Sequence, residues 1–219
     1  RLREPVTMRG NAIAGFTSVA GRSHTFDVRA DGYARGEAID VITSQLHPDD
    51  EAAAADVQGS AVRQDGRSAS LTAPSGQAQQ GVLSASLADA SLVADEVAAL
   101  EAHGTGTALG DPIEAGAIAS VYLACGGRRS VPLAVGSLKA NAGHTEPGAG
   151  LAGTLKLLVQ LWDASLSPNA QLRALNLHVG GALRAGVACA WPVNVGAPFA
   201  VGTMPRLPGG VSSFGYAGT

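Results

Sequence analysis

The sequence predicts an α/β fold in which helices cover a mixed β-sheet. Short apolar runs alternate along the chain with segments that carry helix-start and helix-stop signals, as is typical of such folds. Hydrophobic residues make up 46% of the 219 residues and charged residues 15%, so the chain can bury a sizeable core. Aromatic residues make up only 4%. The core must therefore consist largely of Ala, Val and Leu, which suits close packing of helices on a sheet.

The expected strands are short runs rich in β-branched or other apolar residues. Two of them come early in the chain, a buried one ends at His103, and the next ends near Lys139. A short strand followed by a glycine-rich turn closes the chain. In order, these runs lie within residues 36–46, 54–64, 96–103, 130–139 and 209–219.

Three helices are expected between these strands. The first spans residues 76–90 and begins after a possible N-cap at Ser75. The second starts at "GDP", where Asp111 can cap the helix and Pro112 occupies its first turn. The third is a helix rich in small residues that begins close to His144. Residues 165–208 are rich in Pro and Gly and show little periodicity, so no further helix is assigned there.

Composition and charge exclude several classes of protein. The net charge is −3, and the few positive charges are scattered, so nothing suggests a nucleic-acid partner. The longest apolar stretch, "GAGLAGTLKLLVQLW", contains Lys156 and is too short to span a bilayer comfortably. Two isolated cysteines, Cys125 and Cys189, make neither a disulfide scaffold nor a zinc site. We therefore expect a cytoplasmic protein, with a plastid as the alternative location.

Two histidines lie in similar settings after apolar strands. His103 lies in "EAHGTGTALGDP" and His144 in "GSLKANAGHTEPGAG", 41 residues further on. Loops at strand ends are where α/β proteins place ligands and catalytic groups, and small residues leave room for a substrate. The hydroxyls of Thr105 and Thr107 could bond an extended amide-bearing arm. Lys139, one of only two lysines, precedes His144 by five residues; a cation there would lower the imidazole pKa and keep the ring neutral.

Other chemistries have less support. The spacing in "GTGTALG" does not match a dinucleotide-binding glycine loop, and no P-loop or zinc-hydrolase spacing occurs, so no metal site is expected. The remaining histidines, His24, His47 and His178, lack a comparable glycine frame and are interpreted as ordinary core or loop residues. Both cysteines lie in settings typical of inert packing thiols.

Five motifs together resemble one family, the β-ketoacyl synthases, and more narrowly the ketosynthase domain of type I polyketide synthases. In chain order they are "TFDVRADGYARGEA", "GSAVRQDGRSASLTAPSG", "EAHGTGTALGDPIE", "GSLKANAGHTEPGAG" and "GVSSFGYAGT". The resemblance implies a thiolase-like fold with α-β-α-β-α layers. It implies that residues 1–50 are the end of the N-terminal half and residues 51–219 the C-terminal half. The chain has no initiator Met, and the family's nucleophilic cysteine motif is expected upstream of it.

The resemblance also implies a reaction, the decarboxylative Claisen condensation of an acyl thioester with a malonyl-type extender. His103 and His144 would be the family's two histidines and would stabilise the enolate oxygen. Lys139 would orient His144 and bias its protonation, and Glu146 would help to hold the loop. The product would be a polyketide or a fatty acid.

The same resemblance implies the substrate contacts and partners. Thr105 and Thr107 would bond the phosphopantetheine arm, and the backbone N–H of Tyr216 would complete an oxyanion hole. No cofactor is expected in the domain itself, because its substrates are carried on acyl carrier protein. Further partners would be other synthase domains and, in the complete protein, a second copy in a homodimer.

Two alternatives to a condensing enzyme are open. The first is a non-catalytic ketosynthase-like module that binds acyl groups or carrier protein. The second is a chain-length factor, although the presence of both histidines weighs against it. A cysteine in the upstream motif would favour the enzyme.

Overall fold

The computed structural model describes residues 5–46, 53–66, 68, 70, 73–123, 129, 132–183, 189–190, 197–198 and 207–215. Helices and short strands alternate over most of this chain, with η1 and η3 as 3-10 turns and η2 as a π-helical turn that prolongs α3. The elements are α1 (Pro5–Ile13), α2 (Gly76–Asp89), η1 (Ala94–Glu96), β1 (Ala99–Glu101), α3 (Gly110–Ile118), η2 (Ala119–Leu123), β2 (Leu133–Gly136), α4 (Lys139–Ala142), η3 (Glu146–Gly148), α5 (Ala149–Trp162), β3 (Ser165–Leu166), α6 (Leu177–Leu183), β4 (Cys189–Ala190), β5 (Ala197–Pro198) and β6 (Gly209–Val211).

The main sheet has four strands in the order β4-β2-β1-β6, and all of its neighbouring pairs are parallel. The expected mixed sheet is therefore wrong for these strands. Parallel neighbours need crossover connections, and α3 supplies one between β1 and β2. An antiparallel pair does occur, but it is formed by β3 and β5 in a separate two-stranded sheet.

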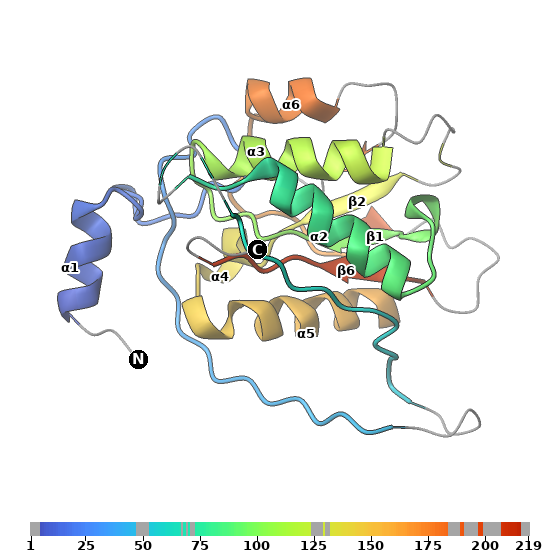
Figure 1. Ribbon diagram of the computed structural model, residues 1–219. Coiled ribbons are helices and arrows are strands. Elements are labelled where there is room, and N and C mark those ends of the chain that lie inside the picture. The colour runs from blue at the N-terminus through green and yellow to red at the C-terminus, as the bar shows by residue number, and fades with distance from the viewer. Residues whose placement is uncertain are drawn as a thin grey trace.

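Helices cover both faces of the parallel sheet (Figure 1). Successive strand residues point to opposite faces, so Leu100 and Val135 join one buried cluster with Ile118 of α3. Ala99 and Ala134 face the other way and pack with Leu157 of α5. The small side chains on this second face let α5 lie close to the strands. The expected α/β architecture, with a core of Ala, Val and Leu, is confirmed.

The three expected helices are present, and one of their expected caps is wrong. Ser75 caps α2 by accepting a hydrogen bond from the N–H of Ala78 at 3.2 Å, as predicted. Asp111 does not cap α3, because Leu109 is the N-cap residue and Asp111 lies inside the first turn. Its carboxylate instead accepts the N–H of Phe26 at 2.7 Å. The expected end of this helix at Gly126 lies outside the described residues.

Two expected strands do not form. Residues 36–46 and 54–64 run as connecting segments outside the sheet, with an isolated bridge at Gln64 (Figure 1), and β-branched side chains such as Ile39 and Val57 are exposed. A strand requires a neighbouring backbone to pair with, which the amino-acid pattern alone does not supply. Conversely, α6 forms within the segment to which no helix was assigned. None of the helices in the described ranges is both long and apolar enough to cross a membrane.

Candidate active site

The two histidine loops meet at one edge of the parallel sheet. Glu101, the last residue of β1, lies beside Gly136, the last residue of β2. His103 follows the first strand by two residues, and His144 follows the second by eight. Because the carboxyl ends of parallel strands lie together, the loops converge, although they are far apart in the sequence.

The structure brings the two imidazole rings into contact. The ring centroids of His103 and His144 are 5.6 Å apart, with an interplanar angle of 89°. The ring of Phe214, which follows β6, lies 5.3 Å from His103. The ring of Tyr33 lies 4.9 Å from His144. Aromatic side chains therefore flank the histidine pair on both sides.

Both imidazoles use the same ring nitrogen as a hydrogen-bond acceptor. The Nδ1 atom of His103 accepts the backbone N–H of Phe214 at 3.1 Å. The Nδ1 atom of His144 accepts the backbone N–H of Glu146 at 3.1 Å. A neutral imidazole has one N–H, so an accepting Nδ1 places the proton on Nε2. Each ring thus has an Nε2–H donor on the edge opposite its backbone contact.

The surroundings keep both rings neutral. Burial, followed by the charge of Lys139 and that of Arg35, lowers the pKa of His144 from 6.5 to about 3. Burial, Lys139 and His144 hold the pKa of His103 well below its usual value. Lys139 itself is only 4% exposed, and burial lowers its pKa. The expected cation near His144 is present, although burial has the larger effect.

Two buried carboxylates of α3, whose roles the sequence analysis missed, shape the loop that carries His103. The carboxylate of Glu114 accepts the N–H groups of His103 and Gly104 at 2.7 and 2.8 Å. Asp111 accepts the N–H of Gly106 at 3.1 Å in addition to that of Phe26. The sequence signal was a pair of acids three residues apart, which lie on one face of a helix.

The two predicted threonines lie side by side on this loop. The hydroxyls of Thr105 and Thr107 are 3.2 Å apart. The Thr107 hydroxyl also accepts the N–H of Gly110 at 3.1 Å at the start of α3. Tyr216, the third predicted substrate contact, lies outside the described residues. In the part of this segment that the structure describes, Phe214, two residues earlier, contacts His103.

The remaining histidines and cysteines are not assigned to this site. His24 is buried, with Nδ1 4.0 Å from a carboxylate oxygen of Asp31, and His178 is exposed. Burial raises the pKa of the Cys189 thiol to about 12. His47 and Cys125 lie outside the described residues. Within the described ranges, no three His, Cys, Asp or Glu side chains cluster so as to hold a metal ion.

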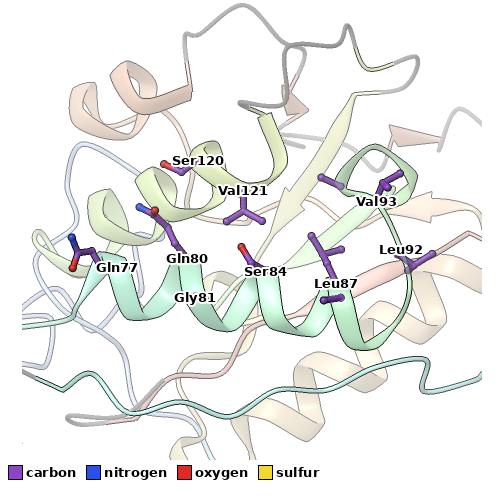
Figure 2. Close-up of a pocket in the computed structure, with 11 residues that line it drawn as sticks. Gln77, Gln80, Gly81, Ser84, Leu87, Leu92, Val93, Ser120 and Val121 are labelled. Carbon is purple, nitrogen blue, oxygen red and sulfur yellow. The ribbon is translucent and has the colours of Figure 1, made fainter.

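An open groove of about 730 Å³ lies away from the histidines, between α2 and the η2 turn (Figure 2). Its lining contains amide, hydroxyl and aliphatic side chains, including Gln80, Ser84 and Leu87. None of the described lining side chains is an acid, a base or a thiol, and we assign the chemistry to the histidine pair.

In comparison with protein families, residues 54–173 match the β-ketoacyl synthase C-terminal domain. Among curated proteins, the chain is 40% identical over its whole length to a phenolphthiocerol/phthiocerol polyketide synthase of Mycobacterium tuberculosis and spans 12% of that protein. It is 38% identical to the erythronolide synthase EryA2 of Saccharopolyspora erythraea over 91% of this chain, and spans 6% of that protein. The chain is therefore a small part of the length of these relatives.

Solved structures give the same result. The oxazolomycin ketosynthase domain OzmH KS7 of Streptomyces albus JA3453 superposes with a TM-score of 0.82 at 27% identity, over 99% of this chain and 38% of that one. The ketosynthase from module 6 of the bacillaene synthase of Bacillus subtilis 168 superposes with a TM-score of 0.78 at 25% identity, over 100% of this chain and 39% of that one.

Proposed function

Because more than half of its residues match the C-terminal domain of β-ketoacyl synthases, the chain belongs to that family, and we propose that it supplies the histidine pair of a condensing ketosynthase. Its relatives are ketosynthase regions of type I polyketide synthases. The likeness to solved ketosynthases also confirms the predicted thiolase-like fold. The division at residue 50 between an N-terminal and a C-terminal half remains our proposal.

The proposed reaction joins two thioesters with loss of carbon dioxide. In the extender, held on acyl carrier protein, the bond between the α-carbon and the carboxylate breaks, and its electron pair forms an enolate. The enolate carbon attacks the carbonyl of an acyl group that a cysteine holds as a thioester. The new carbon–carbon bond forms as the carbon–sulfur bond breaks, and the cysteine thiolate leaves. That cysteine would be supplied by sequence outside this chain.

The observation that carries the proposal is the shared tautomer of the two histidines. The Nδ1 atoms of His103 and His144 both accept a backbone N–H, so each Nε2–H is available to a ligand. The ring centroids lie 5.6 Å apart, and in this proposal both Nε2–H groups donate to one substrate oxygen. An enolate oxygen carries the negative charge that such preorganised donors stabilise.

The lowered pKa values suit this role. A pKa of about 3 for His144 leaves it neutral at physiological pH, and the pKa of His103 is also well below its usual value. A neutral imidazole N–H is a weak acid, so it can donate a hydrogen bond to the enolate without transferring its proton. Proton transfer would quench the carbon nucleophile before condensation. In this proposal Lys139 acts on the histidines by its charge and does not touch the substrate.

The substrate arm and partners follow from the same proposal. Thr105 and Thr107 would bond the amides of phosphopantetheine, and the N–H of Tyr216 would form an oxyanion hole with the cysteine amide. The domain would bind no cofactor of its own. Acyl carrier protein, other synthase domains and a second ketosynthase in a homodimer are the proposed partners. The product class, polyketide or fatty acid, and a cytoplasmic or plastid location are part of the proposal.

The test separates acyl loading from decarboxylation in the complete synthase. His103→Ala and His144→Ala should each slow carbon dioxide release about 100- to 1,000-fold, the usual cost of losing one oxyanion donor. Acyl loading should be affected less, because it depends on the backbone oxyanion hole. Lys139→Ala should give an intermediate loss, and His178→Ala, in an exposed position on α6, should give none. Intact carbon dioxide release with abolished loading in His103→Ala would overturn the role of that residue.

The non-catalytic module is distinguished by the nucleophile. The pKa of Cys189, raised to about 12, leaves its half-buried thiol protonated, which makes it a poor nucleophile. The 219-residue chain alone should therefore show no condensing activity. Condensation by this chain that Cys125→Ala or Cys189→Ala abolishes would contradict the proposal, and a complete synthase without the upstream cysteine would favour the module.

A further inference from the structure

Glu146 adopts a strained backbone conformation at the point where it contacts His144. Its φ angle is 51°, in the left-handed region that a residue with a Cβ enters at a cost. In this conformation its N–H donates to Nδ1 of His144 at 3.1 Å. This hydrogen bond places the proton of the neutral ring on Nε2. The strain therefore occurs at the residue that sets the tautomer.

The side chain of Glu146 is anchored by the segment that contains residues 33–35. One carboxylate oxygen lies 3.0 Å from a guanidinium nitrogen of Arg35, in a pair whose side chains are 23% and 11% exposed. The other oxygen accepts the hydroxyl of Tyr33 at 3.3 Å and the amide of Asn11 at 3.4 Å. Both oxygens are thus held. An ion pair this far removed from solvent is screened less than a surface pair.

The same segment contacts His144 directly. The backbone N–H of His144 donates to the carbonyl of Ala34 at 2.7 Å, and its carbonyl accepts the N–H of Gly36 at 2.9 Å. These bonds make Arg35 the bridge partner of His144. The ring of Tyr33 also packs edge-on against the imidazole. His144 is therefore held by residues more than 100 positions earlier in the chain.

We propose that Arg35 and Tyr33 are positioning residues that act through Glu146 to hold His144 in its Nε2–H tautomer and orientation. The proposal rests on the function proposed above. It adds that residues from the first part of the chain hold His144 in place for that function. Arg35 and Tyr33 hold the carboxylate, and the carboxylate keeps residue 146 in the left-handed conformation. That conformation directs its N–H to the imidazole. Without the anchor the strained residue relaxes, and His144 loses the contact that fixes its proton.

The first experiment measures carbon dioxide release and acyl loading in the complete synthase. Arg35→Met should slow carbon dioxide release about tenfold or more, as loss of an outer partner does for metal-bound histidines. Loading should stay within about twofold, because the acceptor cysteine does not depend on His144. Tyr33→Phe keeps the ring and removes the hydroxyl, so its loss should be smaller. Arg29→Met breaks a second arginine–carboxylate pair, with Asp27, and controls for lost stability: it should lower the free energy of unfolding but leave the rates of both steps per folded molecule unchanged.

A double-mutant cycle distinguishes positioning from a general structural effect. When His144 is already Ala, adding Arg35→Met should change carbon dioxide release by less than about twofold, because residues that act as a unit are not additive. Arg35→Lys should recover part of the rate. Unchanged carbon dioxide release in Arg35→Met, parallel loss of loading, or the same loss with and without His144 would overturn the positioning role. Full carbon dioxide release in His144→Ala would overturn the proposed function itself.

Discussion

The ammonium of Lys156 on α5 lies 2.6 Å from a carboxylate oxygen of Glu101 at the end of β1, and the two side chains are 10% and 3% exposed. The other oxygen of Glu101 accepts the backbone N–H of Leu138 at 2.5 Å. Leu138 immediately precedes Lys139 at the start of α4. The ion pair therefore joins the strand before His103, the loop before His144 and the helix that follows.

Removing one partner of this pair should destabilise the ketosynthase region strongly. Lys156→Met would leave a buried carboxylate without its counter-charge, which typically costs about 3–5 kcal/mol. Combining Lys156→Met with Glu101→Gln should recover part of that loss, because no unpaired charge remains. Chemical denaturation of the complete ketosynthase region measures the free energy of unfolding of the single and the double variant. A loss below about 1 kcal/mol in the single variant would show that the carboxyl group reaches water or takes up a proton, which burial favours by raising the pKa of Glu101.

The depressed pKa of His144 should make the protein less stable in acid. The unfolded histidine binds a proton below about pH 6.5, whereas the folded one stays neutral until about pH 3. Between these values the unfolded state binds more protons, so the free energy of unfolding falls as the pH decreases. The fall is about 1.4 kcal/mol per pH unit for one such group. His144→Gln should flatten the dependence measured between about pH 7.5 and 5, and exposed His178→Gln should not. Identical slopes for His144→Gln and the unchanged protein would contradict the assignment.

The sequence predicted those features of the site that depend on neighbouring residues in the chain. Apolar runs before His103 and Lys139 predicted two strands, each followed by a histidine loop, and the structure has β1 and β2 at these places. The spacing of Lys139 and His144 predicted a cation near the imidazole, and the structure confirms it, with Lys139 as the second cause of the lowered pKa.

Contacts between distant segments could not be predicted from those patterns. Asp111 was interpreted as a helix cap because an acid at a helix start is typical of one, whereas its carboxylate contacts Phe26, 85 residues earlier. Arg35 lies beside His144 only because the two segments form a backbone bridge. Residues 36–46 have the composition of a strand, but strand formation also needs a partner backbone, which the composition does not specify.

Gly104 should not tolerate a side chain. Its φ angle is +44°, and an added Cβ would lie 2.7 Å from side-chain atoms of Ser137 and Thr25. Gly104→Ala should therefore destabilise the protein by about 1–3 kcal/mol through overpacking and displace the loop that carries His103. Gly116→Ala is the matched control, because Gly116 lies in α3 and, outside its own helix backbone and chain neighbours, no described atom lies within 4 Å of the added Cβ. It should stabilise by up to about 1 kcal/mol. Equal effects of the two substitutions on the denaturation midpoint would show that the loop can adjust.

Charged substitutions on the exposed face of α5 should reduce aggregation of the isolated chain but destabilise the complete domain. Leu151, Leu155, Val159 and Trp162 are exposed, and their spacing places them along one side of the helix. The chain corresponds to 38% of a solved ketosynthase, so we expect the rest of the domain to cover this face. The isolated 219-residue chain should bind hydrophobic dyes or aggregate.

The double variant Leu155→Glu with Val159→Lys tests that expectation in both settings. In the isolated chain it should lower dye fluorescence and aggregation, because it breaks the apolar stripe. In the complete ketosynthase it should destabilise by several kcal/mol, because it would bury two charges in an interface built for apolar side chains. Val19→Lys, at an exposed valine in a loop, controls for the added charge. It should change neither the dye binding of the isolated chain nor the stability of the complete ketosynthase. Normal stability of the double variant in the complete domain would show that α5 faces solvent there as well.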